Sequence, residues 1–348
     1  MGYINVIRIG HINNVRLEDI IKMVIGIDQG KRSKPYVFAA KKLGVPYKLV
    51  NCHANDIIQQ IKEVDALIWH WTQDSYIEKR IAFSIIQSAE LMGKMVYPDS
   101  SSCWMFDDKI AEKYLLESIQ IPLVESFVFF SKDNALAWVK EERLPVVYKL
   151  PQGAGSSNVR LIRDWKDAER VCKIHFSLFG RPDFAMQLYS KKLKFYLNEI
   201  IRMLKNDLFK YATQNKGFIY FQKYLPNNTY DIRVTIIGDR AIIFKRWVRP
   251  NDFRASGSGR IDYNVSEEDK KAILIARKVT DQIHSITMAL DFIYDKEKGN
   301  LKIVELSYGF MAKVVEDAPG WYDRSMNFHL ERTDVHEYVI KHLISQKG

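Results

Sequence analysis

Two periods of hydrophobic and polar residues alternate along the first hundred positions of the chain. Apolar runs of strand length at 3–10, 47–50 and 64–71 are separated by stretches of helical period at 34–43 and 77–92. Strands that alternate with helices of this length are typical of a mostly parallel sheet. Gly26 and Gly30 do not have the spacing of a dinucleotide-binding loop. We therefore expect residues 1–98 to form an α/β domain that supports or binds a substrate, not a nicotinamide.

The pattern changes to helices and hairpins after residue 98. Strand–turn–strand patterns cover 144–164, 230–250 and 288–310, and the last two turn at 238–239 and 298–300. Helical patterns begin at Lys109, at 198 within a basic stretch (187–214), and after Ser266, which is a suitable N-terminal cap. The sequence thus predicts an α/β protein in which helices and hairpins follow the N-terminal α/β domain.

Composition and charge narrow the class of protein. The formal net charge is +10, but no long Lys/Arg run occurs, and the densest patch, 191–194, fits a solvated helix face better than a nucleic-acid contact. No apolar run approaches the roughly 20 residues that span a bilayer. The three cysteines are scattered, which argues against a disulfide framework. We expect a cytoplasmic protein that binds neither nucleic acid nor membrane.

The segment 147–162, VYKLPQGAGSSNVRLI, places Lys149 before a loop rich in small residues. Its candidate phosphate-binding residues are Gly153, Gly155, Ser156 and Ser157. One interpretation is a plain turn between strands, and the other is a site where backbone amides and an ammonium bind phosphate. No lysine follows the glycines as in a Walker loop, and the glycines do not precede the lysine as in a protein kinase.

The last predicted hairpin carries a candidate metal site. Glu305 and Ser307 lie two residues apart on one strand and share a face, and Asp291 on the preceding strand can face them. Two acids and a hydroxyl on rigid strands suit Mg²⁺, which prefers oxygen ligands. The alternative is a surface hairpin with solvated acids, but both acids lie within apolar runs, where a carboxylate needs a partner.

The hairpin at 230–250 offers a second set of charges. Asp231 and Arg233 share a face of one strand, and Lys245 and Arg246 lie on the return strand. They fit either a cross-strand ion pair or a nucleotide site in which an acid binds ribose and cations bind phosphate.

In this order, the parts resemble the ATP-grasp superfamily, closest to the branch of ribosomal-protein glutamate ligases and glutathione synthetases. The resemblance covers most of 99–310 and is carried by Asp108-Lys109, Lys149, the loop 153–158, Gln222-Lys223-Tyr224-Leu225, Asp231-Ile232-Arg233, Arg254, Asp291 and Glu305-x-Ser307. It implies a two-lobed ATP-grasp fold after the N-terminal α/β domain, with α+β lobes at 99–217 and 218–348. Two departures are Ser307, where the family usually has Asn, and the segment 255–262, which replaces the usual Asn-containing segment after Arg254. Gln222 also lies where many members have Glu.

The resemblance also implies roles for these residues. Lys109, Lys149 and the loop would bind the ATP phosphates, Gln222, Lys223 and Leu225 would surround adenine, and Asp231 and Arg233 would belong to the nucleotide site. Arg246 and Arg254 would be catalytic, steadying the γ-phosphate or an acyl-phosphate. Asp291, Glu305 and Ser307 would hold Mg²⁺, with Mn²⁺ able to replace it.

The implied activity is ADP-forming ligation of a carboxylate and an amine through an acyl-phosphate. The carboxylate could belong to a small molecule or a glycan, such as a sugar acid, or to an amino acid or peptide. A phosphotransferase and a non-catalytic nucleotide-binding protein are the alternatives. The aromatic strand end at Trp69 and Trp71 fits either a sugar-binding surface or core packing. The oligomeric state stays open, a homodimer included.

Overall fold

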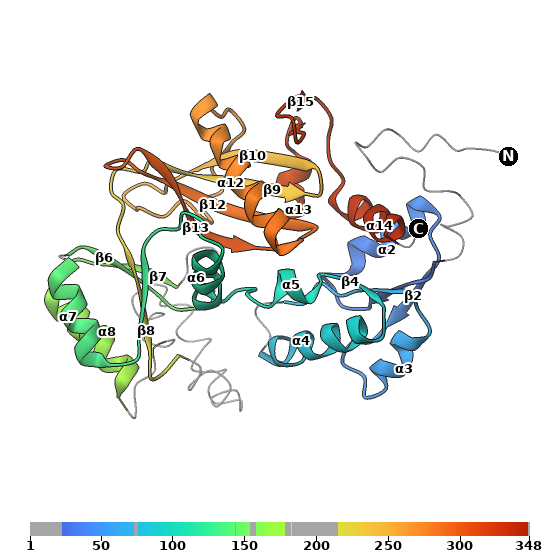
Figure 1. The fold of residues 1–348 in the computed structure, drawn as a ribbon, viewed down its shortest axis with the longest axis horizontal. Coiled ribbons are helices and arrows are strands. Elements are labelled where there is room, and N and C mark those ends of the chain that lie inside the picture. The colour runs from blue at the N-terminus through green and yellow to red at the C-terminus, as the bar shows by residue number, and fades with distance from the viewer. Residues whose placement is uncertain are drawn as a thin grey trace.

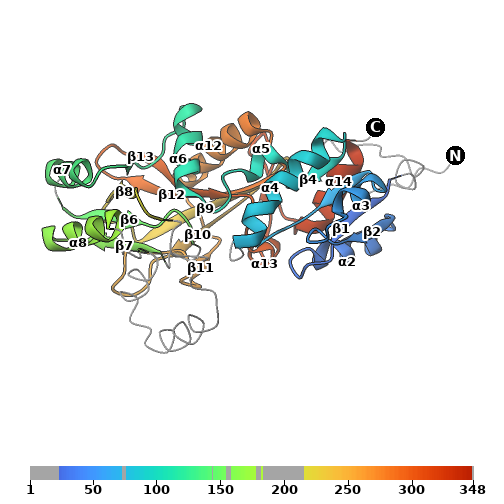
Figure 2. The same ribbon diagram turned by 90° about the horizontal axis from the view of Figure 1, so that it is seen from below.

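Three sheets succeed one another along an elongated molecule in the computed structural model, which describes residues 23–72, 76–142, 144–153, 158–177, 182 and 215–346 (Figure 1). The N-terminal sheet lies at one end, a small sheet covered by two helices at the other, and the largest sheet between them (Figures 1 and 2).

The N-terminal sheet is parallel, as the alternating strand and helix pattern predicted. Its strands, in spatial order, are β2 (Tyr47–Val50), β1 (Ile25–Asp28), β3 (Ala66–Ile68) and β4 (Met95–Tyr97). Its helices are α2 (Lys34–Leu43), α3 (Ile57–Lys62) and α4 (Tyr76–Leu91). Strand β1 was not predicted, and the strand expected at 3–10 lies outside the described residues.

A short linker and a small antiparallel sheet follow. The linker helices are α5 (Ser100–Cys103) and α6 (Lys109–Ser118), and Asp108 caps α6 by accepting the amides of Ile110 and Ala111. The sheet consists of β5 (Ser126–Phe129), β8 (Ile219–Lys223), β6 (Val146–Lys149) and β7 (Val159–Ile162), in that spatial order. Helices α7 (Lys132–Glu142) and α8 (Trp165–Phe176) pack on it. The helix and basic stretch expected at 187–214 lie outside the described residues.

The largest sheet contains both remaining predicted hairpins. Its strands are β13 (Asn300–Ser307), β12 (Thr287–Asp295), β9 (Tyr230–Ile237), β10 (Arg240–Trp247), β14 (Trp321–Tyr322) and β15 (Phe328–His329), and β11 (Ile261–Asp262) pairs with β10. Helix α12 (Glu267–Ile283) packs on this sheet through its apolar stripe, and α13 (Ala312–Glu316) follows β13. Ser266 caps α12, as expected. The turn at Gly238 needs glycine, because its φ is 55° and a Cβ there would lie 2.0 Å from the Tyr338 hydroxyl oxygen.

The C-terminal helix α14 (Val335–Ser345) returns to the N-terminal sheet and lies beside α2 (Figure 1). Its residues Val339, Ile340, Leu343 and Ile344 share one core with β1 and β3.

Trp69 and Trp71 are buried, so they pack in the core and do not form an open sugar-binding surface. Within the described parts of the chain, no helix is long and apolar enough to cross a membrane. The expected domain limits, 1–98, 99–217 and 218–348, remain predictions.

Candidate active site

The acids of the last hairpin face one another. Asp291 on β12 and Glu305 on β13 are cross-strand partners, next to a register shift in the hairpin. Directly opposed side chains of an antiparallel pair lie on one face, with Cβ atoms about 5 Å apart. The Ser307 hydroxyl donates to the Gly309 carbonyl at 2.8 Å and accepts the Gly309 amide at 3.1 Å. The hydroxyl therefore shapes the turn that leaves the hairpin.

Asp291 belongs to a quartet of two acids and two arginines, of which all but the half-buried Arg233 are buried. Arg233 donates to both of its carboxylate oxygens, at 2.6 and 2.8 Å, and Arg246 reaches one of them at 2.7 Å. Arg246 also donates to both oxygens of Asp231, at 2.7 and 2.6 Å. Burial would raise the pKa of Asp291, but the two guanidinium groups outweigh it and lower that pKa. Asp291 is thus a carboxylate with both oxygens engaged.

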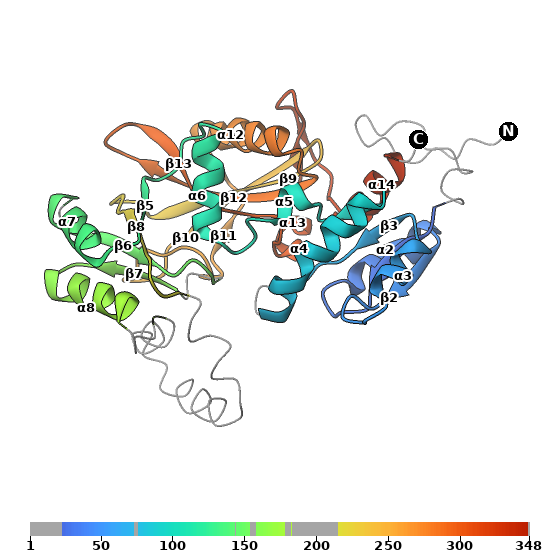
Figure 3. The same cartoon turned by 60° about the horizontal axis from the view of Figure 1, so that its bottom comes forward.

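Two buried lysines, Lys109 and Lys149, act electrostatically on Glu305. Their segments, α6 and β6, belong to different parts of the fold (Figure 3). Lys109, the first residue of α6, lies 3.4 Å from Glu305 and donates to the Gly153 carbonyl at 3.3 Å. Burial acts to lower its pKa, but Glu305 and neighbouring acids raise it overall.

Lys149, at the end of β6, differs from Lys109. Its side chain is 3% exposed, and no described residue forms a hydrogen bond or ion pair with its ammonium. Burial lowers the pKa of Lys149 to about 8, although Glu305 acts in the opposite direction. A buried cation without a partner is costly unless an anion joins it. Lys149 therefore indicates an anion-binding position.

Sequence reasoning missed Glu112, which lies one turn after Lys109 on α6. Its Oε2 accepts the Leu306 amide at 3.2 Å, next to Glu305, while Oε1 is buried and has no partner among the described residues. Burial, and then the Glu305 charge, raise the pKa of Glu112 well above its ordinary value. Its spacing of three residues from Lys109 was the available signal, since it places both on one helix face.

The Gly-rich loop is described only at its edges. The Gly153 amide donates to the Asp107 carboxylate at 2.7 Å. Position 153 requires glycine, because its φ is 123° and a Cβ there would lie 2.3 Å from the side-chain nitrogen of Asn158. Gly155, Ser156 and Ser157 lie outside the described residues. The antiparallel pairing of β6 with β7 confirms the predicted hairpin.

The expected adenine-contacting residues lie at the end of β8, where the chain passes to the largest sheet. Gln222 is buried and donates to the Ser126 hydroxyl at 3.0 Å. The Lys223 amide donates to the Glu125 carbonyl at 2.9 Å, and the Leu225 carbonyl accepts from Asn228 at 3.2 Å. The roles of these residues in nucleotide binding remain predictions.

Arg254 connects the largest sheet to the hairpin of the Gly-rich loop. Its guanidinium donates to Asp252 at 2.6 Å and to the Val159 carbonyl at 3.2 Å. It therefore lies at the start of β7, but the structure does not bring it into the quartet around Arg246. Its catalytic role stays a prediction.

The donor set fits magnesium on one condition. Asp291 and Glu305 are facing carboxylates, which suits an ion that prefers oxygen ligands. The oxygens of Asp291 are engaged by Arg233 and Arg246, so a metal would share Asp291 only if anions drew these guanidinium groups away. Phosphate groups of a nucleotide have the required charge.

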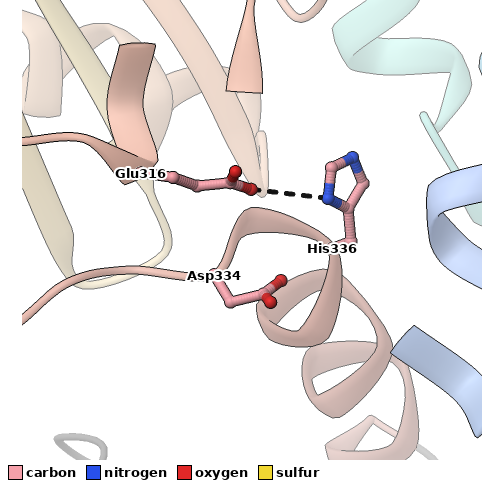
Figure 4. Close-up of side chains that lie close together, drawn as sticks. All are labelled: Glu316, Asp334 and His336. Carbon is pink, nitrogen blue, oxygen red and sulfur yellow. Dashed lines mark ion pairs between the residues drawn. The ribbon is translucent and has the colours of Figure 1, made fainter. Parts of the chain in front are cut away.

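A second cluster of possible metal ligands lies away from this site. Figure 4 shows Glu316, Asp334 and His336, whose ligand atoms lie within 4.8 Å of one another. His336 lies 3.5 Å from Glu316, and Asp334 caps α14 by accepting the Glu337 amide. These groups have structural partners already.

A pocket of about 900 Å³ lies between β4, α12 and α14, and none of the predicted site residues lines it.

Comparisons with known proteins agree with this architecture. The α-aminoadipate–LysW ligase LysX of Saccharolobus solfataricus is 24% identical over 275 residues, which cover 77% of this chain and 85% of LysX. No family model matches the chain.

Solved structures share the fold at low sequence identity. A RimK-domain ATP-grasp protein of Sphaerobacter thermophilus has a TM-score of 0.54 at 13% identity, covering 92% of this chain and 98% of that one. Biotin carboxylase of Campylobacter jejuni, in a β,γ-ATP complex, has a TM-score of 0.59 at 14% identity, covering 94% and 72%.

The three sheets thus have the fold that these ATP-grasp structures share. An ATP-grasp fold is the one that the ordered motifs of the sequence predicted.

Proposed function

We propose that the protein is an ATP-dependent, ADP-forming carboxylate–amine ligase. The observation that carries the proposal is Lys149, a buried ammonium without a partner among the described residues, beside the facing acids Asp291 and Glu305. Cations that receive phosphates next to acids that receive a metal are the groups that phosphoryl transfer needs. The sequence relative is itself named as a ligase, and it matches most of the chain.

In the proposed reaction, a substrate carboxylate attacks the γ-phosphate of ATP and gives an acyl-phosphate and ADP. An amine then attacks the activated carbonyl and releases phosphate. Lys109 and Lys149 would hold the phosphates, and Arg246 would move from Asp231 and Asp291 to phosphate oxygens as the nucleotide binds. Asp291 and Glu305 would hold Mg²⁺, which neutralises phosphate charge when bound. The chain would act through alignment and charge neutralisation.

Product analysis tests this function against its alternatives. The protein is incubated with Mg-ATP, a panel of carboxylates and a panel of amines, and both ADP and the amide product are measured. A ligase forms amide only when both substrates are present. A phosphorylated product without an amine would indicate a phosphotransferase, and binding of ATP without turnover across the panels would favour a non-catalytic nucleotide-binding protein.

A binding measurement supports the assay. Mg-ATP should raise the melting temperature because it binds only the folded state, and Lys149→Ala should remove the rise. The matched control is Lys140→Ala, which removes an exposed lysine of α7. A wild-type protein that does not respond to millimolar Mg-ATP would refute the proposed function.

A further inference from the structure

The N-terminal sheet has a topological switch point whose residues no role above has used. The chain passes from β1 to β2 on one side, and then to β3 on the other side of β1. In open parallel sheets, ligands bind outside the carboxyl ends of the strands at such a point. The segments that leave these ends are 29–33 after β1 and 69–72 after β3.

The segment after β1 carries positive charge to this edge. Lys31 and Arg32 are exposed, and Ser33 precedes the ten-residue helix α2 without capping it through its side chain. Instead, the Ser33 hydroxyl accepts the His70 amide at 3.2 Å, which joins the two segments. The positive end of the α2 dipole lies beside these cations, although Pro35 contributes no amide hydrogen there.

The acids at the same edge are already engaged. Asp28 accepts the Gly30 amide at 2.8 Å and the Cys52 amide at 3.1 Å. Glu78 accepts the Thr72 amide and lies 3.7 Å from His53. These carboxylates are acceptors, and they offer no hydrogen-bond donor to an anion.

Two polar side chains beside this edge have no hydrogen-bond partner among the residues that the structure describes. The Tyr308 hydroxyl belongs to a residue that is 1% exposed, and no described residue forms a hydrogen bond with it. The ring of His70 also forms no hydrogen bond within the described chain, and its centroid lies 5.6 Å from that of Tyr308. A buried hydroxyl without a partner is rare in native proteins and calls for an explanation.

Arg32 is close enough to influence both side chains. Burial, and then the Arg32 charge, lower the pKa of His70 to about 4, so the imidazole is neutral and one ring nitrogen is a donor. Arg32 also lies close enough to act on the Tyr308 side chain, and a tyrosine hydroxyl keeps its proton at neutral pH and can donate it in a hydrogen bond.

The same residues adjoin the candidate active site. Tyr308 follows Glu305 by three positions, about 10 Å of extended chain. The His70 Nε2 lies 3.6 Å from the position of a Cβ on Gly309, the residue whose backbone holds the Ser307 hydroxyl. A small molecule could therefore span both places.

We propose that Arg32, His70 and Tyr308, which we name the switch-point cluster, bind a compact anionic group of a substrate, either a carboxylate or a phosphate. This anionic group is not the group that reacts, because Tyr308 lies about 10 Å of extended chain away from Glu305. The inference rests on the proposed ligase function and narrows its substrate class. The substrate carries a second anion, separated from its reacting group.

Calorimetric titration of the full chain in the presence of Mg-ADP tests the cluster. The probes are glutarate, with two carboxylates, 3-phosphoglycerate, with a phosphate and a carboxylate, and butyrate, with one carboxylate. At least one dianion should bind roughly tenfold or more tightly than butyrate, because charge-assisted hydrogen bonds are strong. Whether glutarate or 3-phosphoglycerate binds better distinguishes a carboxylate from a phosphate.

Three variants attribute that binding to the cluster. Arg32→Ala and Tyr308→Phe should each weaken dianion binding, Arg32→Ala by roughly tenfold. Lys41→Ala, which removes an exposed charge at the other end of α2, should leave it unchanged. Equal affinity for dianions and butyrate, no binding of either dianion, or unchanged affinity in both cluster variants would overturn the proposal.

The ATP-dependent rise in melting temperature is measured on every variant and is expected to persist. If the unaltered chain lacks that rise, the ligase function fails, whatever the dianions do. If the rise is present and dianion binding does not depend on Arg32 and Tyr308, only the cluster fails.

Discussion

Replacement of Lys149 by methionine should stabilise the protein without nucleotide and abolish its response to ATP. The pKa of Lys149 falls from 10.5 to about 8 in the fold. At about 1.4 kcal/mol per pKa unit, the native state disfavours the charged lysine by about 3 kcal/mol. Methionine has a similar length and no charge, so the free energy of unfolding at pH 7 should rise by up to that amount.

The pH dependence gives the sign of the effect. Between pH 8 and 10.5 the unfolded chain retains the proton of Lys149 and the native protein has released it, so stability rises with pH over this window. Below about pH 8 both states hold the proton, and the cost is fully present. Lys149→Met should remove this contribution to the pH dependence.

Thermal unfolding at pH 7 and pH 10, with and without Mg-ATP, measures both effects. Without nucleotide at pH 7, the variant should melt roughly 5 °C higher than the wild type, since 1 kcal/mol corresponds to about 2 °C in a chain of this size. The control Lys140→Met removes an exposed lysine and should change little. A variant that melts lower at pH 7, with the pH dependence of the wild type, would refute the electrostatic reasoning.

Three further predictions concern the metal site and the fold. Magnesium alone should not raise the melting temperature, because Arg233 and Arg246 bind the oxygens of Asp291. Magnesium together with ADP should raise it. A rise with magnesium alone would contradict this prediction. Glu305→Ala should lower the rate of ADP release on the order of 100-fold, and near-normal activity of this variant would rule out the metal site. Ser307→Asn should lower the magnesium concentration at which ADP release reaches half its maximal rate. Gly238→Ala should destabilise the protein by about 2 kcal/mol more than Gly299→Ala, since only the former places a Cβ against another residue; equal melting temperatures would contradict it.

The hairpins were predictable from the sequence because their signals are local. The glycine turns at 238 and 299, between alternating apolar runs, fixed which strands pair. The short loop at 296–299 also let Asp291 be placed opposite Glu305, since side-chain direction has a period of two. The local apolar pattern likewise indicated the parallel N-terminal sheet, although it placed the first strand at 3–10 and missed 25–28.

Tertiary contacts were not predictable in the same way. Arg246 has two acids within reach, and only the packed sheet shows that its guanidinium bridges Asp231 and Asp291. Glu112 looks like an ordinary polar residue of an amphipathic helix until α6 packs against β13. The pairing of His70 with Tyr308 joins residues 238 positions apart, and no local pattern encodes such a contact.

The position of α14 has a consequence for the order in which the chain can fold during synthesis. Residues 339–344 complete the core around β1 and β3, so this sheet cannot bury that apolar face until α14 has been synthesised. Until then the face is exposed and available to chaperones or to aggregation. A stop codon just before residue 335 would thus destabilise the N-terminal sheet, although every residue of that sheet would still be made.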